Sequence, residues 1–190
     1  MSKKNIAILI FFTAILIDQI SKIYIKTHFS LGEEVIVFSN WFKIHFTENN
    51  GLAWGFEFGG KTGKLFLTLF RLVAIIGIIY WLAQTIKRKI HTAVIIAISL
   101  ILAGAVGNII DSVFYGIIFD SSHGKVATLF AENPYGSLFH GKVVDMLYFP
   151  IYEGKSFTFF NAIFNAADTC ISIGVVLLFI YNKQAFPKNN

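Results

Sequence analysis

The chain has 190 residues, a length that fits one domain. Hydrophobic residues make up 55% of it and charged residues only 14%, whereas a soluble domain carries about 25% charged residues. So few charges cannot cover a folded surface in water, and the composition excludes an ordinary soluble protein. The basic residues stand in short clusters beside apolar runs, so the net charge of +5 favours a membrane protein, and no nucleic-acid partner is expected.

Four apolar segments are long enough to cross a bilayer as helices, which takes about 20 residues each. They cover roughly residues 6–24, 65–86, 92–110 and 159–181. No small-x-small cleavage site follows the first segment, and Asp18 and Lys22 stand where such a site would lie. We therefore interpret this segment as a retained helix and not as a secretory signal. The expected fold class is a membrane all-α bundle of four transmembrane helices, forming a single integral membrane domain over residues 1–190.

The positively charged residues predict an orientation in the membrane. The short segments on one side of the spans contain no Asp or Glu, and they hold Lys3, Lys4, Lys87, Arg88, Lys89, Lys183 and Lys188. Because Lys and Arg accumulate in cytoplasmic segments, both termini are expected in the cytoplasm. The longer connections, about residues 27–63 and 112–157, are then expected on the outer side.

The first outer loop predicts strands and not a helix. Residues 34–38 and 41–46 are rich in β-branched and aromatic side chains, and Ser39 and Asn40 make a turn between them. A small extracytoplasmic antiparallel β-sheet is expected, with its Trp and Phe rings at the level of the lipid headgroups. The second outer loop is rich in Gly, Ser, His, Asn and Pro between residues 119 and 141, so we expect it to be irregular.

Charged side chains inside the spans need a reason, because one near the bilayer centre costs at least about 2.5 kcal/mol. Asp18 and Lys22 lie one helical turn apart and are able to pair, so a polar clamp and a role in placing substrate both stay open. Arg71 is long enough to snorkel to the headgroups, and Asp111 is placed to orient its neighbours. Asp168 differs, because no basic residue lies within a helical turn of it in sequence. It must be protonated, hydrated or paired through the fold.

A second carboxylate precedes the fourth span. Asp145 lies on the same outer side as Asp168, and a loop returning to the membrane is able to bring the two together. Two carboxylates at one site share a proton. The ionised one takes a proton from water, while the protonated one donates to the scissile carbonyl or to the leaving amine. This is aspartic-protease chemistry, and it requires no metal.

Other catalytic patterns are missing from the sequence. It contains no H-E-x-x-H zinc motif, no cluster of cysteines, no G-x-S-x-G and no P-loop. The five histidines are scattered, and the single cysteine, Cys170, lies within an apolar run, where packing is the simpler role. We therefore expect no metal ion and no cofactor.

Five blocks of the sequence, taken in order, resemble the bacterial lipoprotein signal peptidases, also called signal peptidase II or prolipoprotein signal peptidase. The blocks extend over nearly the whole chain, and they are Asp18–Lys22, Asn49–Trp54, Gly104–Asp111, Gly141–Asp145 and Phe164–Asp168. One block alone is a weak signal, but five in order on four spans are specific. The resemblance implies four membrane helices and an outer sheet that cradles the substrate.

The resemblance also implies roles for particular residues. Asp145 and Asp168 are the expected catalytic pair, and Asp18 and Lys22 are expected to brace the helices. The positions expected to support or line the site are Asn49, Gly51, Asn108, Asp111 and Asn165.

The implied enzyme is an intramembrane aspartic endopeptidase of the bacterial cytoplasmic membrane, with its active site at the outer face. It removes the signal peptide from prolipoproteins that carry diacylglyceryl on a cysteine, cutting just before that cysteine. The expected partners are therefore lipid-modified prolipoproteins and membrane lipids, and a monomer is expected.

Two features depart from the family pattern. Ser112 stands where the family usually has a basic residue, so Lys125 or Lys142 is a candidate to supply that cation. The stretch from Ser112 to Gly141 is also longer than is typical of the family. Neither departure touches the two expected catalytic aspartates.

Two other functions are compatible with the spans. In a small proton-coupled membrane transporter, a relay of ionisable residues would cross the membrane, formed by Asp18, Arg71, Asp111 and Asp168. A structural membrane subunit would only bind partners. The gathering of Asp111, Asp145 and Asp168 towards the outer side favours an interfacial enzyme over both alternatives.

Overall fold

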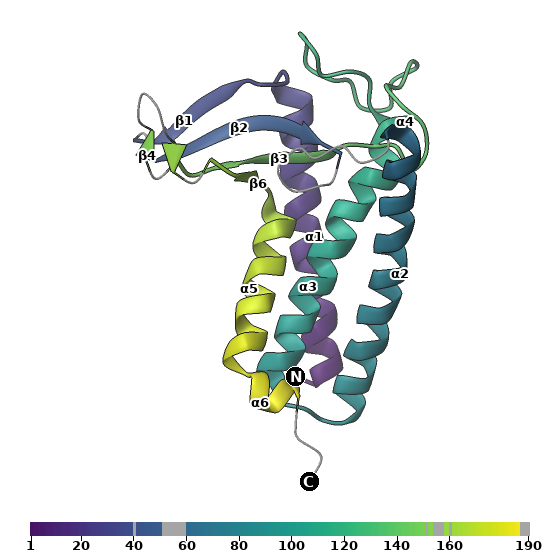
Figure 1. Ribbon diagram of the computed structural model, residues 1–190, viewed down its shortest axis with the longest axis vertical. Coiled ribbons are helices and arrows are strands. Elements are labelled where there is room, and N and C mark those ends of the chain that lie inside the picture. Colours follow the sequence, from purple (N-terminus) through teal and green to yellow (C-terminus); the bar gives the residue numbers. More distant parts are fainter. Residues whose placement is uncertain (40, 51–59, 151, 154–157, 160, 187–190) are drawn as a thin grey trace. The chain divides into compact units, whose positions relative to one another are not determined.

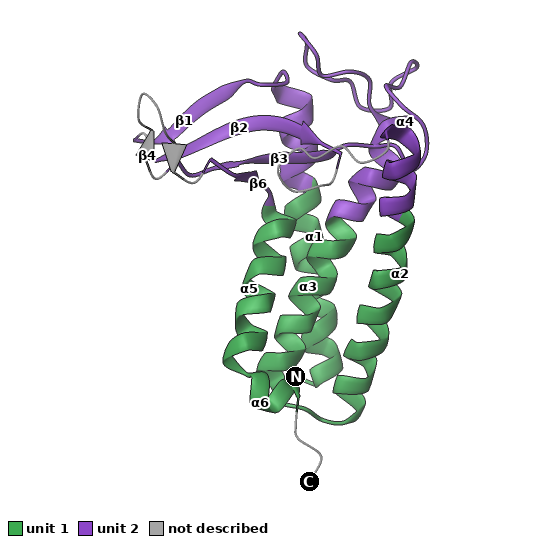
Figure 2. Ribbon diagram, viewed as in Figure 1, with its two compact units in different colours: residues 1–19, 69–107, 166–190 green, residues 20–68, 108–165 purple. Residues whose placement is uncertain are grey.

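The computed structural model describes residues 1–39, 41–50, 60–150, 152–153, 158–159 and 161–186 (Figure 1). The chain forms two compact units, which Figure 2 shows in different colours. Unit 1 consists of residues 1–19, 69–107 and 166–190, and unit 2 consists of residues 20–68 and 108–165. Three long helices contribute residues to both units.

Unit 1 is helical. It contains the greater parts of α1 (Lys3–His28), α2 (Gly60–Lys87) and α3 (Thr92–Ile110), together with α5 (Ala166–Ile180) and α6 (Asn182–Ala185). Helices α1 and α2 and the stretch Thr92–Ile118 are long and apolar enough to cross a membrane, and α5 is a shorter apolar helix. Large apolar side chains such as Leu16, Ile76 and Phe179 are exposed. Such surfaces suit lipid, so the chain is a membrane protein.

Helix α5 begins later than the sequence predicts. The fourth span is expected over about residues 159–181, whereas α5 starts at Ala166 because Ile163–Phe164 form strand β6. The 15 residues of α5 rise by roughly 22 Å, which is less than the hydrocarbon thickness of about 30 Å. The helical part of the fourth apolar segment is therefore shorter than predicted.

Close helix packing within unit 1 depends on glycine. A Cβ atom on Gly174 of α5 would lie 2.6 Å from the backbone carbonyl oxygen of Ala97 on α3. A Cβ atom on Gly107 of α3 would lie 2.6 Å from the Oδ2 atom of Asp18 on α1. Small residues at such positions let helix backbones approach closely, as is common in membranes. Helix α3 is therefore packed tightly against both α5 and α1.

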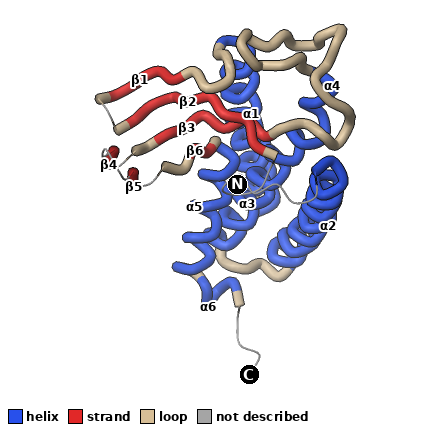
Figure 3. The backbone as a smooth tube through the Cα atoms, turned by 45° about the horizontal axis from the view of Figure 1, so that its top comes forward, coloured by secondary structure: helices blue, strands red, loops and turns tan. Residues whose placement is uncertain are grey.

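Unit 2 contains a four-stranded antiparallel sheet. Its strands are β1 (Glu34–Phe38), β2 (Phe42–Asn49), β3 (Val143–Tyr148) and β6, in the order β1-β2-β3-β6 (Figure 3). The predicted antiparallel pairing of residues 34–38 with 41–46 is confirmed. Ser39 has a positive φ of 50°, which suits a tight turn, and Asn40 lies outside the described residues. A separate two-stranded sheet pairs β4 (Tyr152–Glu153) with β5 (Thr158–Phe159).

A hydrophobic core packs against this sheet. It consists of Ile25, Phe46, Tyr115, Phe119, Ala127, Val144 and Met146. Side chains alternate between the two faces of a strand, so Asp145 points away from the face on which Val144 and Met146 join the core. The apolar residues of β3 therefore fix the direction in which Asp145 projects.

Beyond α3 the chain continues through one π turn. Residues Asp111–Tyr115 form this turn, and Gly116–Ile118 form the short helix α4. Such turns are rare and occur frequently at functional sites. Residues 119–142, all of which the structure describes, contain only isolated bridges, so the predicted irregular loop is confirmed.

Candidate active site

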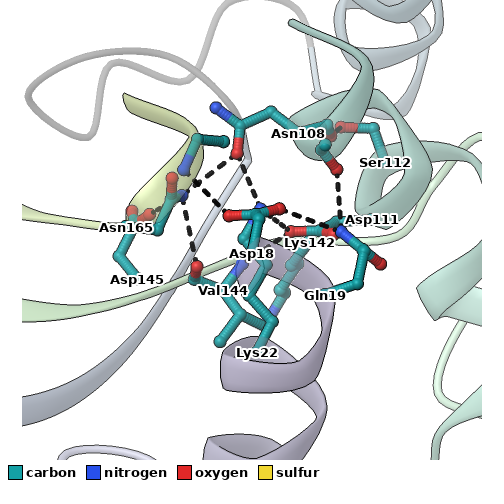
Figure 4. Close-up of polar contacts among 12 residues, drawn as sticks. Asp18, Gln19, Lys22, Asn108, Asp111, Ser112, Lys142, Val144, Asp145 and Asn165 are labelled. Atoms are coloured by element: carbon teal, nitrogen blue, oxygen red, sulfur yellow. Dashed lines mark hydrogen bonds and ion pairs between the residues drawn. The ribbon is translucent and has the colours of Figure 1, made fainter. Parts of the chain in front are cut away.

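Asp145 belongs to a buried polar site in unit 2, and Figure 4 shows it among its polar neighbours. It occupies the middle of β3 and is only 2% exposed. Its Oδ1 atom accepts a hydrogen bond from the side-chain amide of Asn165 over 2.6 Å, and its Oδ2 atom accepts one from the side-chain amide of Asn49. Each oxygen of the carboxyl group therefore has an amide donor that fixes its orientation.

The strand order explains why these two amides reach the carboxyl group. Asn49 is the last residue of β2, and β2 pairs with β3 so that Thr47 lies opposite Asp145. Residues two apart on a strand point to the same side, so the side chains of Asn49 and Asp145 share one face of the sheet. Asn165 directly follows β6, the strand on the other side of β3. Asp145 thus receives one donor from the last residue of β2 and one from the residue that follows β6.

A second set of buried residues joins this site to α1 and to the π turn. Lys22 of α1 is fully buried, and its Nζ atom donates to Oδ1 of Asn108 over 2.8 Å. The same Asn108 oxygen accepts a hydrogen bond from Asn165 over 3.0 Å. Lys22 is therefore connected through Asn108 to one of the two amides that hold Asp145 (Figure 4).

Lys22 reaches β3 by another route as well. Its Nζ atom forms an ion pair with Oδ2 of Asp111 over 2.8 Å, and both side chains are fully buried. Asp111 also accepts a hydrogen bond from the backbone N–H of Val144 over 3.3 Å. Taking two charges out of water is costly, and their attraction offsets this cost only with good geometry and further hydrogen bonds. The contacts to Asn108 and Val144 supply those hydrogen bonds.

Asp18 contacts residues of unit 1. It is 1% exposed, and its Oδ1 atom accepts a hydrogen bond from the backbone N–H of Ala167 over 2.9 Å. Ala167 is the second residue of α5, whose first four N–H groups have no acceptor inside the helix. Gln19 donates to Asp18 over 3.0 Å and to the carbonyl oxygen of Gly107 over 3.1 Å. These contacts suit the bracing role expected of Asp18.

Asp168 lies in the first turn of α5, also in unit 1. The unpaired N–H groups at that end of a helix carry a partial positive charge, which favours a negative charge nearby. Arg71 of α2 interacts electrostatically with Asp168. The sequence shows no basic residue near Asp168, and here a basic partner comes from another helix. Snorkelling is therefore not the only role open to Arg71.

The candidate replacements for the family's basic residue already have carboxylate partners. Ser112 is buried, and its hydroxyl donates to a backbone carbonyl one turn earlier over 3.0 Å. Lys125 pairs with Asp120 inside the second outer loop. Lys142 pairs with Glu48 of β2 over 3.4 Å. Lys142 therefore pairs with Glu48, the residue directly before Asn49, whereas Lys125 pairs with a residue of its own loop.

Gly51 lies outside the described residues. Cys170 is partly buried in α5. Among the residues that the structure describes, no group of three or more His, Cys, Asp or Glu side chains is placed to hold a metal ion.

The sequence did not predict that Asp145 lies on a strand of the same sheet as Asn49. The run Val143–Tyr148 is rich in β-branched and apolar residues, and this run is the signal that would have indicated a strand. The link between Asp111 and the backbone of Val144 was also missed, because it depends on that strand.

Apolar helices and a buried aspartate held by two amide donors define an integral membrane protein with a carboxylate site. The chain matches the family described as signal peptidase (SPase) II over residues 10–183. It belongs to this family, whose members are proteases.

Relatives with known names are similar over most of their length. A lipoprotein signal peptidase of Porphyromonas gingivalis is 48% identical over 179 residues, which cover 87% of this chain and 77% of the relative. Another of Amoebophilus asiaticus is 33% identical over 188 residues, covering 90% and 75%. A solved bacterial membrane enzyme, determined by the in meso method at 1.9 Å resolution, has a TM-score of 0.63 at 28% identity. That similarity covers 97% of this chain and 94% of the other.

Proposed function

We propose that this protein is an intramembrane aspartic endopeptidase that removes the signal peptide from diacylglyceryl-modified prolipoproteins, cutting just before the lipidated cysteine. The observation that carries the proposal is the setting of Asp145, a buried carboxyl group with one amide donor on each oxygen. The relatives named lipoprotein signal peptidase support the substrate class.

Asp168 is the second carboxyl group of the proposed pair. It follows Asn165 by three residues, so the chain keeps the two Cα atoms within roughly 11 Å of each other. Asn165 in turn donates directly to Asp145. The two aspartates of the proposed pair are therefore linked through Asn165, which contacts Asp145 and lies three residues before Asp168. Asp168 lies in the first turn of α5 and interacts with Arg71 of α2.

In the proposed mechanism one carboxyl group is ionised and the other is protonated, because two negative charges in one buried site are unfavourable. The ionised group takes a proton from a water molecule, whose oxygen attacks the carbonyl carbon of the scissile bond. The protonated group gives its proton to the carbonyl oxygen. When the tetrahedral intermediate collapses, the amine of the lipidated cysteine leaves with a proton from the pair.

The remaining residues of the site are proposed to position this pair or to line it. They are Asp18, Lys22, Asn49, Gly51, Asn108, Asp111 and Asn165. Asn49 and Asn165 orient Asp145 directly. Lys22 acts through its contacts with Asn108 and Asp111.

We also propose that four segments cross the bacterial cytoplasmic membrane, with both termini in the cytoplasm and the active site at the outer face. A substrate anchored by its lipid chains keeps little of the positional freedom of a dissolved peptide, which favours reaction at the interface. The enzyme is proposed to act as a monomer on its lipid-modified substrates.

The test is a gel-shift cleavage assay with purified protein in detergent and a diacylglyceryl-modified prolipoprotein. Wild type is compared with Asp145→Asn, Asp168→Asn and, as a matched control, Asp120→Asn in the second outer loop. We expect wild type and Asp120→Asn to cleave, and the other two variants to show no measurable cleavage while keeping the melting temperature of the wild type.

One result would contradict the choice of catalytic residues, and another would contradict the endopeptidase activity itself. Near-normal cleavage by Asp145→Asn or Asp168→Asn would remove that residue from the catalytic pair. If wild type leaves the precursor intact where a characterised peptidase cuts it, the endopeptidase proposal fails. Proton flux in proteoliposomes would then test the transporter alternative.

A further inference from the structure

Lys26 is a buried cation outside the site around Lys22. It lies one turn further along α1 and is fully buried. Its Nζ atom forms an ion pair with Glu48 of β2 and donates to the hydroxyl of Ser122 over 2.9 Å. The aromatic rings of Phe119 and Tyr135 lie 5.2 and 4.9 Å from it, within the range of cation–π attraction.

Glu48 joins several parts of unit 2. Its side chain is 4% exposed, and it pairs with Lys26 and, over 3.4 Å, with Lys142. Ser122 donates to it over 3.3 Å. The hydroxyl of Tyr135 accepts a hydrogen bond from the backbone N–H of Lys142 over 2.7 Å. Burial raises the pKa of Tyr135, so its ring faces the two lysines as a neutral group.

We call these five residues, Lys26, Glu48, Ser122, Tyr135 and Lys142, the Lys26 cluster. It connects α1, the end of β2, the second outer loop and the start of β3. A buried ion pair is a weak source of stability, because desolvation opposes the attraction. The position of the cluster in the sheet suggests another role for it.

Glu48 directly precedes Asn49, the residue whose amide donates to Asp145. Adjacent residues on a strand point to opposite faces, so Glu48 is held on one face of β2 and Asn49 reaches Asp145 on the other. The pairing of β2 with β1 ends at His45, and the backbone of Phe46 still bonds to Gly32 and Glu33 just before β1. Residues 47–49 of β2 are held by their pairing with β3 on one side and by the Lys26 cluster through the side chain of Glu48.

We propose that Lys26 and Glu48 are positioning residues of the active site, which hold the end of β2 so that the Asn49 amide stays on Asp145. The second outer loop takes part through Ser122 and Tyr135. This inference rests on the proposed function, since it treats Asp145 as catalytic. Loss of Glu48 removes the carboxylate that pairs with the buried Lys26, and loss of Lys26 leaves Glu48 with the longer pair to Lys142. In either case the end of β2 moves away from Asp145.

The experiment measures kcat and KM with the lipidated precursor for Lys26→Met, Glu48→Gln and the double variant. The matched control is Lys43→Met. Lys43 lies at the opposite end of β2 and pairs over 3.1 Å with Glu34 of β1. We expect each single variant to lose about 10- to 100-fold in kcat, with KM changed by less than about 2-fold, because a small misplacement costs rate before it costs binding.

The double variant separates positioning from general stability. If Lys26 and Glu48 act as one unit, it loses no more kcat than the worse single variant. The control Lys43→Met is expected to keep kcat within about 2-fold of the wild type. Multiplicative losses in the double variant, an equal loss in the control, or a folded Lys26→Met variant with normal kcat would each overturn the inference.

If Lys26→Met does not fold, Ser122→Ala is the second variant, since it removes only a hydroxyl that contacts both charges. We expect it to lower kcat by about 3- to 10-fold at unchanged KM, and a normal kcat would overturn the inference.

Hydrogen exchange of the substrate-free protein gives a readout that does not depend on cleavage. Residues 46–49 and 143–146 are expected to exchange faster in Glu48→Gln than in the wild type or in Lys43→Met. If wild type cleaves no precursor, the proposed function fails, and exchange alone decides whether the Lys26 cluster holds β2. Unchanged exchange in Glu48→Gln would show that it does not.

Discussion

The side-chain amide of Asn165 donates to the carboxyl group of Asp145 over 2.6 Å, and Asn165 is also the residue immediately before α5. One amide therefore connects the aspartate on β3 with the start of the helix that carries Asp168. The same amide contacts Asn108 over 3.0 Å, so a single side chain links three segments that are distant in sequence. This relationship makes Asn165 the most informative position for mutation.

Asn165→Ala is expected to lower kcat on the lipidated precursor by about 10- to 100-fold, because Asp145 loses one of the donors that orient it. The control is Asn161→Ala, the same change at an exposed asparagine four residues earlier. Steady-state kinetics in detergent check the prediction. Equal activities of the two variants would show that the Asn165 amide is dispensable.

Lys22→Met is expected to destabilise the protein by roughly 3–5 kcal/mol, because it removes the buried cation that lies 2.8 Å from the carboxylate of Asp111. Thermal unfolding in detergent measures the effect, and Lys22→Met with Asp111→Asn should recover part of the lost melting temperature. Lys125→Met removes one partner of an exposed pair, in which the lysine side chain is 56% accessible, and should change little. A melting temperature for Lys22→Met equal to that of Lys125→Met would contradict the prediction.

Gly141→Ala is expected to cost about 1–3 kcal/mol of stability and to reduce activity, because the new methyl group overfills a tight contact. Its Cβ atom would collide with the carbonyl oxygen of Asp111 and lie 2.8 Å from the backbone nitrogen of Gly116. Gly136→Ala is the control, since its Cβ atom would make contacts no shorter than 3.4 Å. Melting temperature and cleavage rate are both measured, and a Gly141→Ala protein that behaves like Gly136→Ala would disprove the close contact.

The β1–β2 hairpin is expected to lose stability in acid. Hydrogen bonds from His45 and Lys43 hold the pKa of Glu34 below its usual value of 4.5. Because the folded-state pKa is the lower one, the stabilisation is present above about pH 4.5 and is lost as the pH falls through the folded-state pKa. Hydrogen exchange of residues 34–38 in wild type and Glu34→Gln should differ at pH 6 and converge well below pH 4.5. A difference independent of pH would rule out this role of the carboxylate.

Hydropathy and local pattern predicted the elements whose signal is contained in one segment. The first three spans and the β1–β2 hairpin are of this kind, because length, apolar content and strand propensity are local properties. Strand β3 was missed because its partner in β2 lies far away in the chain, and Asn49 and Asp145 are 96 residues apart. The start of α5 was placed too early because the apolar residues before Ala166 fit a helix and a strand equally well.

For the site, too, local features were predictable from the sequence and long-range contacts were not. The residue types and blocks around Asp145 and Asp168 were visible in the sequence, and the structure brings Lys22, Asn49, Asn108, Asp111 and Asn165 together around Asp145. Partners across the fold were not visible. In the sequence Lys26 is a lysine near the end of an apolar segment, with nothing to indicate burial. The structure shows it buried and paired with Glu48.

Strand β1 lies at the edge of its sheet, and all five of its residues are exposed. An exposed edge with apolar side chains offers backbone hydrogen-bonding groups to any other strand that meets it. Two molecules extracted from the membrane therefore have a ready way to pair through β1. Dimers seen after purification should be tested with a charged substitution such as Ile36→Lys before they are taken to be the enzyme's state in the cell.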